Sequence, residues 1–250
     1  TFNCGNNRLT TTLNVMNNPH LTSLKCPDNQ LSRLDVSRNA ELEDLFCDNN
    51  NLTSLDVSNN TELDNLCCNG NPLTSLDVSK NTKLTRLECF KTQLTSLDVS
   101  KNTELTILDC SLNQLSSLDV SNNTKLKELT CNYNNIGYLY LSKNTKLESL
   151  HCSDNRIDQL NLSDNINLTG ISCKNNRLTN LKLDNNVSLL RPEFISFDNQ
   201  SSTRRFQRMS NGSNVNDCWA LPVGTTDASR ICNLKIDGVS KTPSFVPRNS

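Results

Sequence analysis

Cysteine recurs along this chain at a fixed interval, and that interval limits the folds that the chain can adopt. Eight cysteines follow one another at a spacing of 21 residues from Cys26 to Cys173, and Cys4 precedes the first of them by 22 residues. Aliphatic residues keep the same interval at the positions of Leu24 and Val36. A period of about 20 to 50 residues indicates a solenoid, in which each unit buries its apolar side only against its neighbours.

The repeat also explains a low apolar content, which is 34% with only 4% aromatic residues. About six inward positions per repeat, roughly 29% of its residues, suffice for a solenoid, whereas a layered core of this size needs more. Leu24, Lys25 and Cys26 alternate between inward and outward positions, which predicts a short strand. Because the next copy lies one coil away, the strands are expected to stack in parallel about 4.8 Å apart.

Asparagine follows the cysteine by three residues in most repeats, beginning with Asn29, and Thr92 interrupts this column once. An amide turned inward is expected to bond the freed backbone groups of its own turn and the next one. These patterns predict an α/β-type repeat solenoid with a parallel concave β-sheet, one short strand per 21-residue coil and little regular helix.

The consensus LTxLxCxxNxLTSLDVSxNTx closely resembles the leucine-rich repeat, and in particular its 21-residue variety with cysteine at the sixth position, found in internalin-J-like surface proteins of bacteria. The resemblance covers residues 1–189. It implies a right-handed superhelix, and it implies adhesion or host interaction as the biological setting. Fold alone does not define function, so the ligand must be argued from the surface.

The chain divides into three parts. Residues 1–189 are predicted to form a solenoid of about nine coils without an N-terminal cap, because Phe2 and Cys4 already occupy core columns. Residues 190–238 are predicted to form an irregular C-terminal cap that covers the last apolar face, with a degenerate tenth strand around residues 194–200. Residues 239–250 are rich in Ser, Thr and Pro and are interpreted as a linker or tail. The chain is therefore interpreted as a piece of a longer protein.

Three cysteines stand outside the regular column. Within the column we expect buried, reduced thiols, since parallel side chains do not suit a disulfide torsion; column disulfides and a soft-metal column are the alternatives. Cys67 is predicted to be a free, exposed thiol on the concave face. Cys218 and Cys232 are predicted to form a disulfide worth roughly 3 kcal/mol, which implies an oxidising compartment.

Two other patterns raise the question of metal binding and catalysis. A column of aspartates beginning at Asp35 suggests calcium, but hydrogen bonds from each Asp to its own turn are the preferred interpretation. His151 is expected beside Ser149, Ser153 and Asp154, yet a flat sheet has no cleft or oxyanion hole for nucleophilic catalysis. The sequence therefore predicts no enzyme, no cofactor and no metal site.

Charge and hydropathy exclude some partners. The net charge is −1, from 25 basic and 26 acidic residues, so the chain carries no electrostatic signal for nucleic acid or for an anionic membrane surface. The sequence contains no apolar run of the length that spans a bilayer, so this segment is not expected to insert into a membrane. A protein or a glycan is the expected ligand.

Outward positions of the strands vary between repeats, and variation there sets what such a solenoid binds. Large apolar residues gather in the second to sixth repeats among acidic neighbours, which indicates an interaction patch. The residues predicted to bind the ligand on the concave face are Phe46, Glu88, Phe90, Ile107, Asp109, Leu112, Glu128, Tyr133 and His151. The second choice is Tyr138 with Tyr140, on the convex side.

The preferred functional hypothesis is a secreted or surface-displayed, noncatalytic recognition or adhesion module. One alternative is an accessory subunit of an outer-membrane nutrient-uptake complex, which would place the chain in a larger surface assembly. The other is a secreted effector that uses the repeats to recruit a target. Reduced Cys218 and Cys232 would favour the effector.

Overall fold

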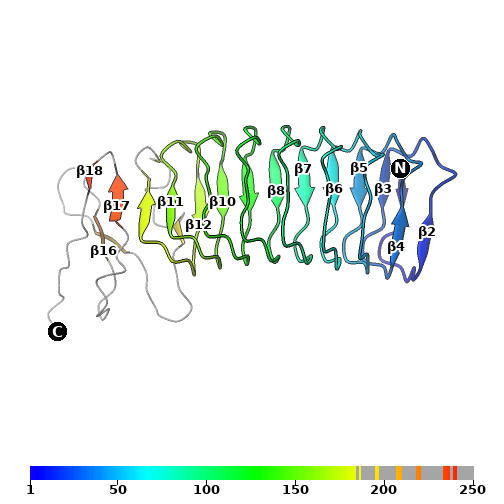
Figure 1. Ribbon diagram of the computed structural model, residues 1–250, viewed down its shortest axis with the longest axis horizontal. Helices are drawn as coiled ribbons and strands as arrows, with labels where there is room; N and C mark the ends of the chain where they lie inside the picture. Colours follow the sequence, from blue (N-terminus) through cyan, green and yellow to red (C-terminus); the bar gives the residue numbers. More distant parts are fainter. Residues whose placement is uncertain are drawn as a thin grey trace.

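The computed structural model describes residues 1–183 and 186, together with the backbone of five short strands beyond them. Every regular element in this described part is a strand, and none of its residues forms a helix. The coils stack into an elongated solenoid, with each turn repeating after 21 residues (Figure 1). This confirms the predicted repeat solenoid. None of the described residues belongs to a helix that is long and apolar enough to span a membrane.

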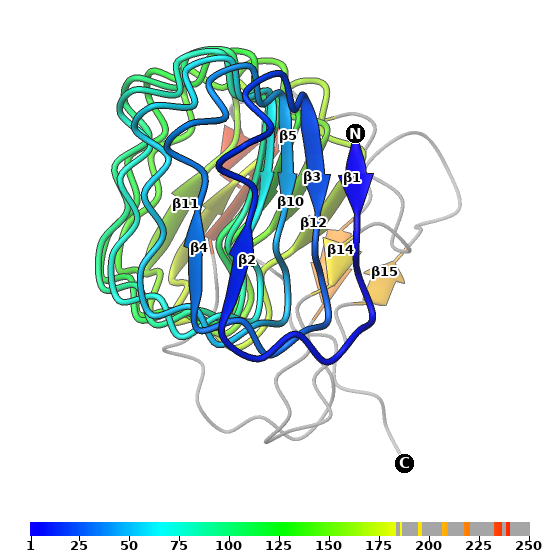
Figure 2. The ribbon, with the colours of Figure 1, turned by 90° about the vertical axis from the view of Figure 1, so that its right-hand side faces the viewer.

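One parallel sheet of ten strands runs the length of the solenoid. Neighbouring strands pair at corresponding repeat positions, so that Leu66 lies beside Leu45 and Leu87. Figure 2 shows β1 and β14 further out than β5 and β10, so the outer surface of this sheet is concave. Its strands in order are β1 (Phe2–Asn3), β3 (Ser23–Lys25), β5 (Asp44–Phe46), β6 (Asn65–Cys67), β7 (Arg86–Glu88), β8 (Ile107–Asp109), β9 (Glu128–Thr130), β10 (Ser149–His151), β12 (Gly170–Ser172) and β14 (Ile195–Ser196).

Shorter pairings form the opposite wall. β2 (Thr12–Asn14) pairs in parallel with β4 (Arg33–Asp35), and further along the order is β11 (Gln159–Asn161), β13 (Asn180–Lys182), β17 (Asn233–Ile236) and β18 (Val239–Ser240). β15 (Gln207–Met209) pairs antiparallel with β16 (Cys218–Ala220).

The C-terminal predictions fall mostly outside the described residues. β14 lies within the range predicted for a degenerate tenth strand and pairs in parallel with β12. The predicted linker over 239–250 begins with β18, which is paired with β17. Of the predicted cap, the structure describes the backbone of β14, β15, β16 and β17. The proposed bridge between the side chains of Cys218 and Cys232 lies outside the described part of the chain.

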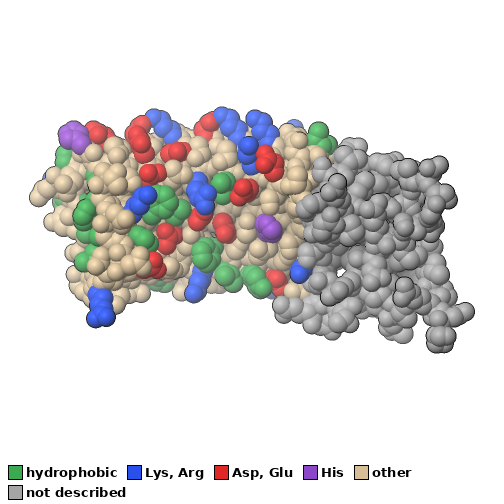
Figure 3. Space-filling model, turned by 180° about the vertical axis from the view of Figure 1, so that it is seen from behind, with side chains coloured by type: hydrophobic (Ala, Val, Ile, Leu, Met, Phe, Trp, Pro, Cys, Tyr) green, Lys and Arg blue, Asp and Glu red, His purple; other side chains and the backbone are tan. Residues whose placement is uncertain are grey.

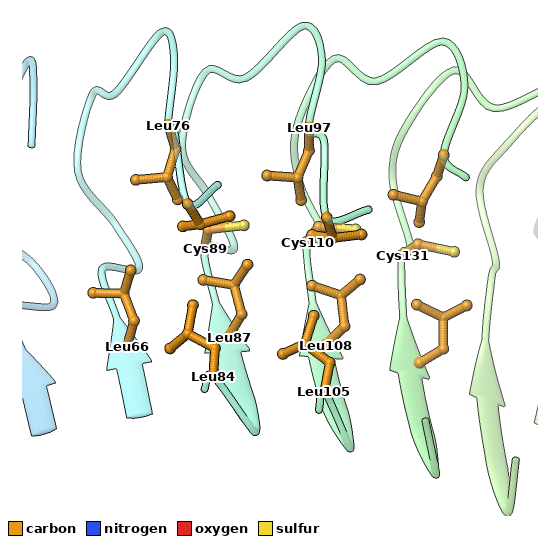
Figure 4. Packing of buried hydrophobic residues seen from close by; sticks show 14 of the residues in the cluster. Leu66, Leu76, Leu84, Leu87, Cys89, Leu97, Leu105, Leu108, Cys110 and Cys131 are labelled. Carbon is orange, nitrogen blue, oxygen red and sulfur yellow. The ribbon is translucent and has the colours of Figure 1, made fainter. Parts of the chain in front are cut away.

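The core is a set of parallel columns inside the coil. The cysteines from Cys26 to Cys173 are at most 3% exposed, which confirms that the column is buried, and those from Cys26 to Cys152 form no disulfide. Figure 4 shows Cys89 and Cys110 in one row between the strand leucines Leu87 and Leu108 and the leucines of the opposite wall. Burial of one leucine stabilises the fold by about 1.5–3 kcal/mol, and the benefit is renewed in each coil.

The asparagine column that follows the cysteines binds consecutive coils together. Asn134 Nδ2 donates to the carbonyl oxygens of Cys110, Cys131 and Asn132 at 3.0–3.2 Å. Its Oδ1 accepts from the backbone N–H of Leu115 at 3.0 Å. The amide therefore joins its own coil to the preceding one, whereas the sequence predicted its own and the next. At Thr92 the hydroxyl reaches only Cys89 O and Asn113 Oδ1, so the bridge to the preceding coil is missing.

A second asparagine column lies at the far side of the coil. Asn123 Nδ2 donates to Val99 O at 3.0 Å and to Asn102 O at 2.8 Å. Unlike the first column, these asparagines have a side-chain oxygen that accepts no hydrogen bond. All are at most 1% exposed: Asn39, Asn60, Asn81, Asn102, Asn123, Asn144, Asn165 and Asn186.

Candidate binding surface on the concave sheet

The concave sheet presents a continuous surface on which successive coils place equivalent side chains about 4.8 Å apart. Figure 3 looks onto this side and shows hydrophobic side chains mixed with acidic and basic ones over its middle. Phe46, Glu88, Ile107, Asp109 and Glu128 are strand residues of β5, β7, β8 and β9 that face outward beside buried leucines. The structure therefore brings most of the predicted patch onto adjacent strands.

One outward row crosses β5, β6 and β7 through Phe46, Cys67 and Glu88, which lie in register. The Lys25 ammonium lies 5.0 Å from the centre of the Phe46 ring, a cation–π contact that leaves Phe46 half-buried. The Arg86 guanidinium pairs with the Glu88 carboxylate and contacts the Cys67 thiol.

The prediction that Cys67 is an exposed thiol is wrong. Its side chain is 4% exposed, because the two strand neighbours in its row, Phe46 and Glu88, are large and Arg86 contacts the thiol. Burial and, to a smaller extent, the nearby carboxylates of Glu88 and Asp48 together raise the pKa of Cys67 to about 12. The thiol therefore lies beneath the side chains of the surface and is poorly suited to react as a nucleophile.

Carboxylates dominate the polar part of this surface. Glu88 and Asp109 are register partners on β7 and β8, and Ile107 is paired with Glu128 in the same way on β8 and β9. Asp109 Oδ1 accepts from Ser111 N at 2.9 Å. Asp48, in the position after the ladder cysteine, is largely buried, and this burial raises the pKa of its carboxyl.

Leu112 and Tyr133 lie on the rim of the sheet, in the turn that follows the strand. Both have a backbone φ of 54°, in the left-handed region, and their side chains are 45% and 51% exposed. Most other coils place Asn, Asp or Gly at this position, residue types that tolerate the left-handed region, and Lys91 is a further exception. Two bulky side chains are thus held in a strained backbone with much of their surface in water.

A shallow pocket of about 320 Å³ opens beside the Tyr133 ring. Its lining is mixed, and the Ser153 and Ser172 hydroxyls in it are 2.8 Å apart. Asp154 in the same wall accepts from Asn175 Nδ2 at 2.7 Å.

The predicted Ser and His neighbours are brought together only in part. Ser149 Oγ and His151 Nε2 lie 3.2 Å apart on β10, in an exposed position. Ser153 instead contacts Ser172, and Asp154 contacts Asn175. His151 thus lies beside a hydroxyl, but no acid is shown orienting its ring among the described residues. The arrangement lacks the oriented base that a nucleophilic serine requires.

The aspartate column on the opposite wall caps its own turns. Asp98 Oδ1 accepts from Ser100 N at 2.8 Å, and this bond recurs in the coils of Asp35, Asp56, Asp77 and Asp119. These hydrogen bonds from serine lower the pKa of the carboxyls, which confirms the preferred interpretation of the column. Within residues 1–183 and 186, no three His, Cys, Asp or Glu side chains gather to hold a metal ion.

The second-choice surface is an aromatic pair. The rings of Tyr138 and Tyr140 are stacked, with centroids 6.4 Å apart and planes inclined by 9°. They are 58% and 75% exposed. The pair flanks the buried Leu139 and lies off the ten-stranded sheet.

Sequence reasoning missed three members of the concave surface. Asp48 and Asn69 occupy the position after the ladder cysteine, the same column as Phe90, and Arg86 occupies the first outward strand position, the same column as Ile107. Asn69 Nδ2 donates to Glu88 Oε2 at 3.0 Å, and its Oδ1 accepts from Phe90 N at 2.8 Å. Their place in the repeat register was the signal that would have identified them.

Comparison with solved structures agrees with the class that the fold and the repeat define. The chain is a leucine-rich-repeat solenoid of the 21-residue, cysteine-ladder type. In particular, it is similar to the functional domain of InlJ from Listeria monocytogenes, which includes a cysteine ladder: the identity is 35%, the TM-score is 0.66, and the match covers 79% of this chain and 48% of that one. The chain thus spans about half the length of the InlJ chain.

More distant structures share the fold. Internalin C2 of Listeria monocytogenes is 22% identical, with 79% and 78% of the two chains covered and a TM-score of 0.58. The ectodomain of the Arabidopsis thaliana receptor kinase GASSHO1/SCHENGEN3 is 20% identical, with 78% of this chain and 26% of that one covered and a TM-score of 0.68. A scan against protein-family models and a search of curated proteins each gave no match.

Proposed function

We propose that this chain is a noncatalytic recognition module that binds a protein partner through its concave sheet, at the cell surface or outside the cell. The observation that carries the proposal is the rim, where Leu112 and Tyr133 are exposed in a left-handed backbone that most other coils give to glycine, asparagine or aspartate. Strain of this kind persists at functional sites, and exposed aromatic residues anchor interfaces. Similarity to InlJ supports a surface setting.

The rim continues onto the sheet. Phe90 follows β7, and its backbone N–H is held by Asn69. Phe46 and Ile107, both half-buried, belong to β5 and β8. These apolar side chains are interspersed with carboxylates on the sheet, and apolar anchors among polar groups support an interface.

The test compares two pairs of aromatic residues on different faces. One variant carries Phe90→Ala with Tyr133→Ala, and the matched control carries Tyr138→Ala with Tyr140→Ala. A partner recovered from a host-surface extract is purified, and its Kd for each variant is measured directly. Loss of an aromatic anchor costs about 2 kcal/mol or more, so the first variant is expected to bind at least about 30-fold more weakly. Unchanged binding in the first variant with weaker binding in the control would assign recognition to the Tyr138–Tyr140 face.

A glycan is the second candidate ligand, and the pocket beside Tyr133 favours it. An aromatic ring next to two serine hydroxyls and a carboxylate offers both a stacking surface and hydrogen-bond partners. A glycan array probed with wild type and with Ser172→Ala is the appropriate measurement. Signals that depend on Ser172 but not on Phe90 would separate a glycan site from the protein-binding surface.

A further inference from the structure

The acidic side chains of the concave sheet differ from the glutamates on the loops at the edge of the coils. On the loops at the edge of the coils, glutamates pair with a lysine of a neighbouring coil, as in Glu62 with Lys83 and Glu104 with Lys125. The repeat is therefore able to supply a cation one coil away. On the described part of the concave sheet no carboxylate has such a lysine, and Glu88 pairs with Arg86 of its own strand.

Four further carboxylates on this surface have no cationic partner within residues 1–183: Asp44, Asp48, Asp109 and Glu128. Their hydrogen bonds come from neutral donors, which are Asn65 Nδ2 for Asp44 at 2.8 Å, Asn69 N for Asp48 at 3.1 Å and Ser111 N for Asp109 at 2.9 Å. Cations in this region are engaged elsewhere or lie at the margin: Arg86 at Glu88, Lys127 at Glu148, Lys25 over the Phe46 ring, and Lys91 on the rim turn.

The spacing of the carboxylates makes the lack of counter-charge more pronounced. Glu88 and Asp109 are register partners, so their strand positions are about 4.8 Å apart. Like charges at this separation repel one another, and a cation placed between them is attracted by both. Asp48 also lies in an excess of negative charge. Burial and the nearby carboxylate of Glu88 both raise the pKa of the Asp48 carboxyl.

We propose that the concave sheet selects a cationic protein segment, in which lysine or arginine side chains meet Asp48, Glu88, Asp109 and Glu128 while an apolar side chain packs against Phe46, Phe90 and Ile107. Charge complementarity is the argument for this occupant, because the surface offers five carboxylates against two cations, Arg86 and Lys91, across β5 to β9 and their following turns. The inference rests on the proposed function and specifies its partner.

The binding test uses three short synthetic peptides. The first has lysines alternating with leucine and phenylalanine, the second replaces each lysine by glutamate, and the third keeps the lysines but replaces the apolar residues by glycine. Titration calorimetry with the full chain is done at about 50 mM and about 300 mM salt. The first peptide is expected to bind, to bind more weakly by roughly tenfold at the higher salt, and to bind more tightly than either of the others.

Substitutions locate the effect on the surface. Asp48→Asn with Asp109→Asn removes two charges and keeps the side-chain oxygens that accept from Asn69 N and Ser111 N. The matched control, Asp77→Asn with Asp98→Asn, removes two charges from the opposite wall. The double substitution on the concave sheet is expected to raise the Kd of the first peptide by at least about tenfold. The control substitutions are expected to leave this Kd unchanged.

Several outcomes would overturn the inference: no binding of the first peptide to wild type, equal binding of the glutamate peptide, a Kd independent of salt, or equal weakening by both pairs of substitutions. These outcomes differ from a failure of the proposed function. A partner that needs Phe90 and Tyr133 but binds without salt dependence would contradict the cationic segment and leave recognition by the concave sheet intact.

Discussion

Asp48 Oδ1 accepts a hydrogen bond of 3.1 Å from the backbone N–H of Asn69, across the junction of two coils. Burial nevertheless outweighs this bond and raises the pKa of the Asp48 carboxyl. A raised folded-state pKa means that the charged form destabilises the fold above that pKa, and that this destabilisation disappears as the pH falls through it. We therefore expect Asp48→Asn to raise the free energy of unfolding at pH 7, with the gain vanishing in acid.

Asp98→Asn serves as the control of opposite sign. Hydrogen bonds from Ser100 lower the pKa of the Asp98 carboxyl, so the stability that it contributes is present above its ordinary pKa and is lost as the pH falls through the lowered value. This substitution is expected to reduce stability at neutral pH. Urea unfolding of both variants from pH 3 to pH 8, roughly the range in which carboxyls titrate, measures the two trends. Parallel trends would contradict the argument.

The two asparagine columns are expected to differ in their contribution to stability. Asn134→Ala leaves the buried N–H of Leu115 without its partner and removes three further bonds, so we expect a loss of about 3 kcal/mol. Asn123→Ala is expected to cost only about 1 kcal/mol. The carbonyls that Asn123 bonds still accept from the backbone N–H groups of Asn102 and Leu105, and an unpartnered oxygen is removed.

Urea unfolding with constant m-values is the measurement for this pair. Equal losses for Asn134→Ala and Asn123→Ala would mean that the difference in hydrogen bonding between the columns has no energetic effect.

The rim position provides a test of strain. Leu112→Asn and Tyr133→Asn place in the turn a residue that tolerates a φ of 54°. Each is therefore expected to stabilise the fold by about 0.5–1 kcal/mol and to weaken binding of the partner. Gly70→Ala at the same position is expected to destabilise, because φ is 63° and a Cβ would lie 2.3 Å from Asn49 Oδ1. Thermal unfolding of the three variants shows whether each one is more or less stable than the wild type. Destabilisation by both asparagine variants would refute strain at the rim.

Cys67 is expected to be unreactive in the native state. A thiol that is 4% exposed and has a pKa of about 12 contains very little thiolate at neutral pH. Glu88→Gln removes a carboxylate that raises this pKa, so labelling of Cys67 by a thiol reagent is expected to become faster. Mass mapping after a short exposure to the reagent identifies the labelled cysteine. Rapid labelling of Cys67 in the wild type would contradict its burial.

Cys110 tests the cysteine column itself. Cys110→Ser places a hydroxyl in a fully buried site, and an unsatisfied polar group there costs about 1–3 kcal/mol. Cys110→Ala leaves no polar group and is expected to cost less. A serine variant as stable as the wild type would show that the column tolerates polar groups.

The columns of the solenoid could be predicted from the sequence because inward positions recur at a period that tolerates no drift. Leu24 and Cys26 face the core in register with their copies, and the strand in each repeat follows from that alternation. The second asparagine column was equally visible in the repeat, yet its role depends on hydrogen bonds between coils that only the stacked structure shows.

The site was predictable only in outline. Register places Phe46 and Glu88 on the surface, but the exposure of Cys67 depends on the size of its neighbours in other coils, which a single repeat does not reveal. Leu112 and Tyr133 were assigned to the concave face as large apolar residues at outward positions. Their left-handed backbone places them in the turn at the rim instead.

The replacement of asparagine by Thr92 has a mechanical consequence. At every other coil boundary from Cys4 to Cys173 an asparagine amide bridges to the cysteine of the preceding coil, whereas the carbonyl of Cys68 receives no such bond from residue 92. Tension applied along the solenoid axis would therefore separate the coils first at this boundary. The same boundary lies between the coils that carry Cys67 and Glu88. A partner bound across Cys67, Glu88 and Phe90 would therefore hold these two coils together where their side-chain hydrogen bonding is weakest.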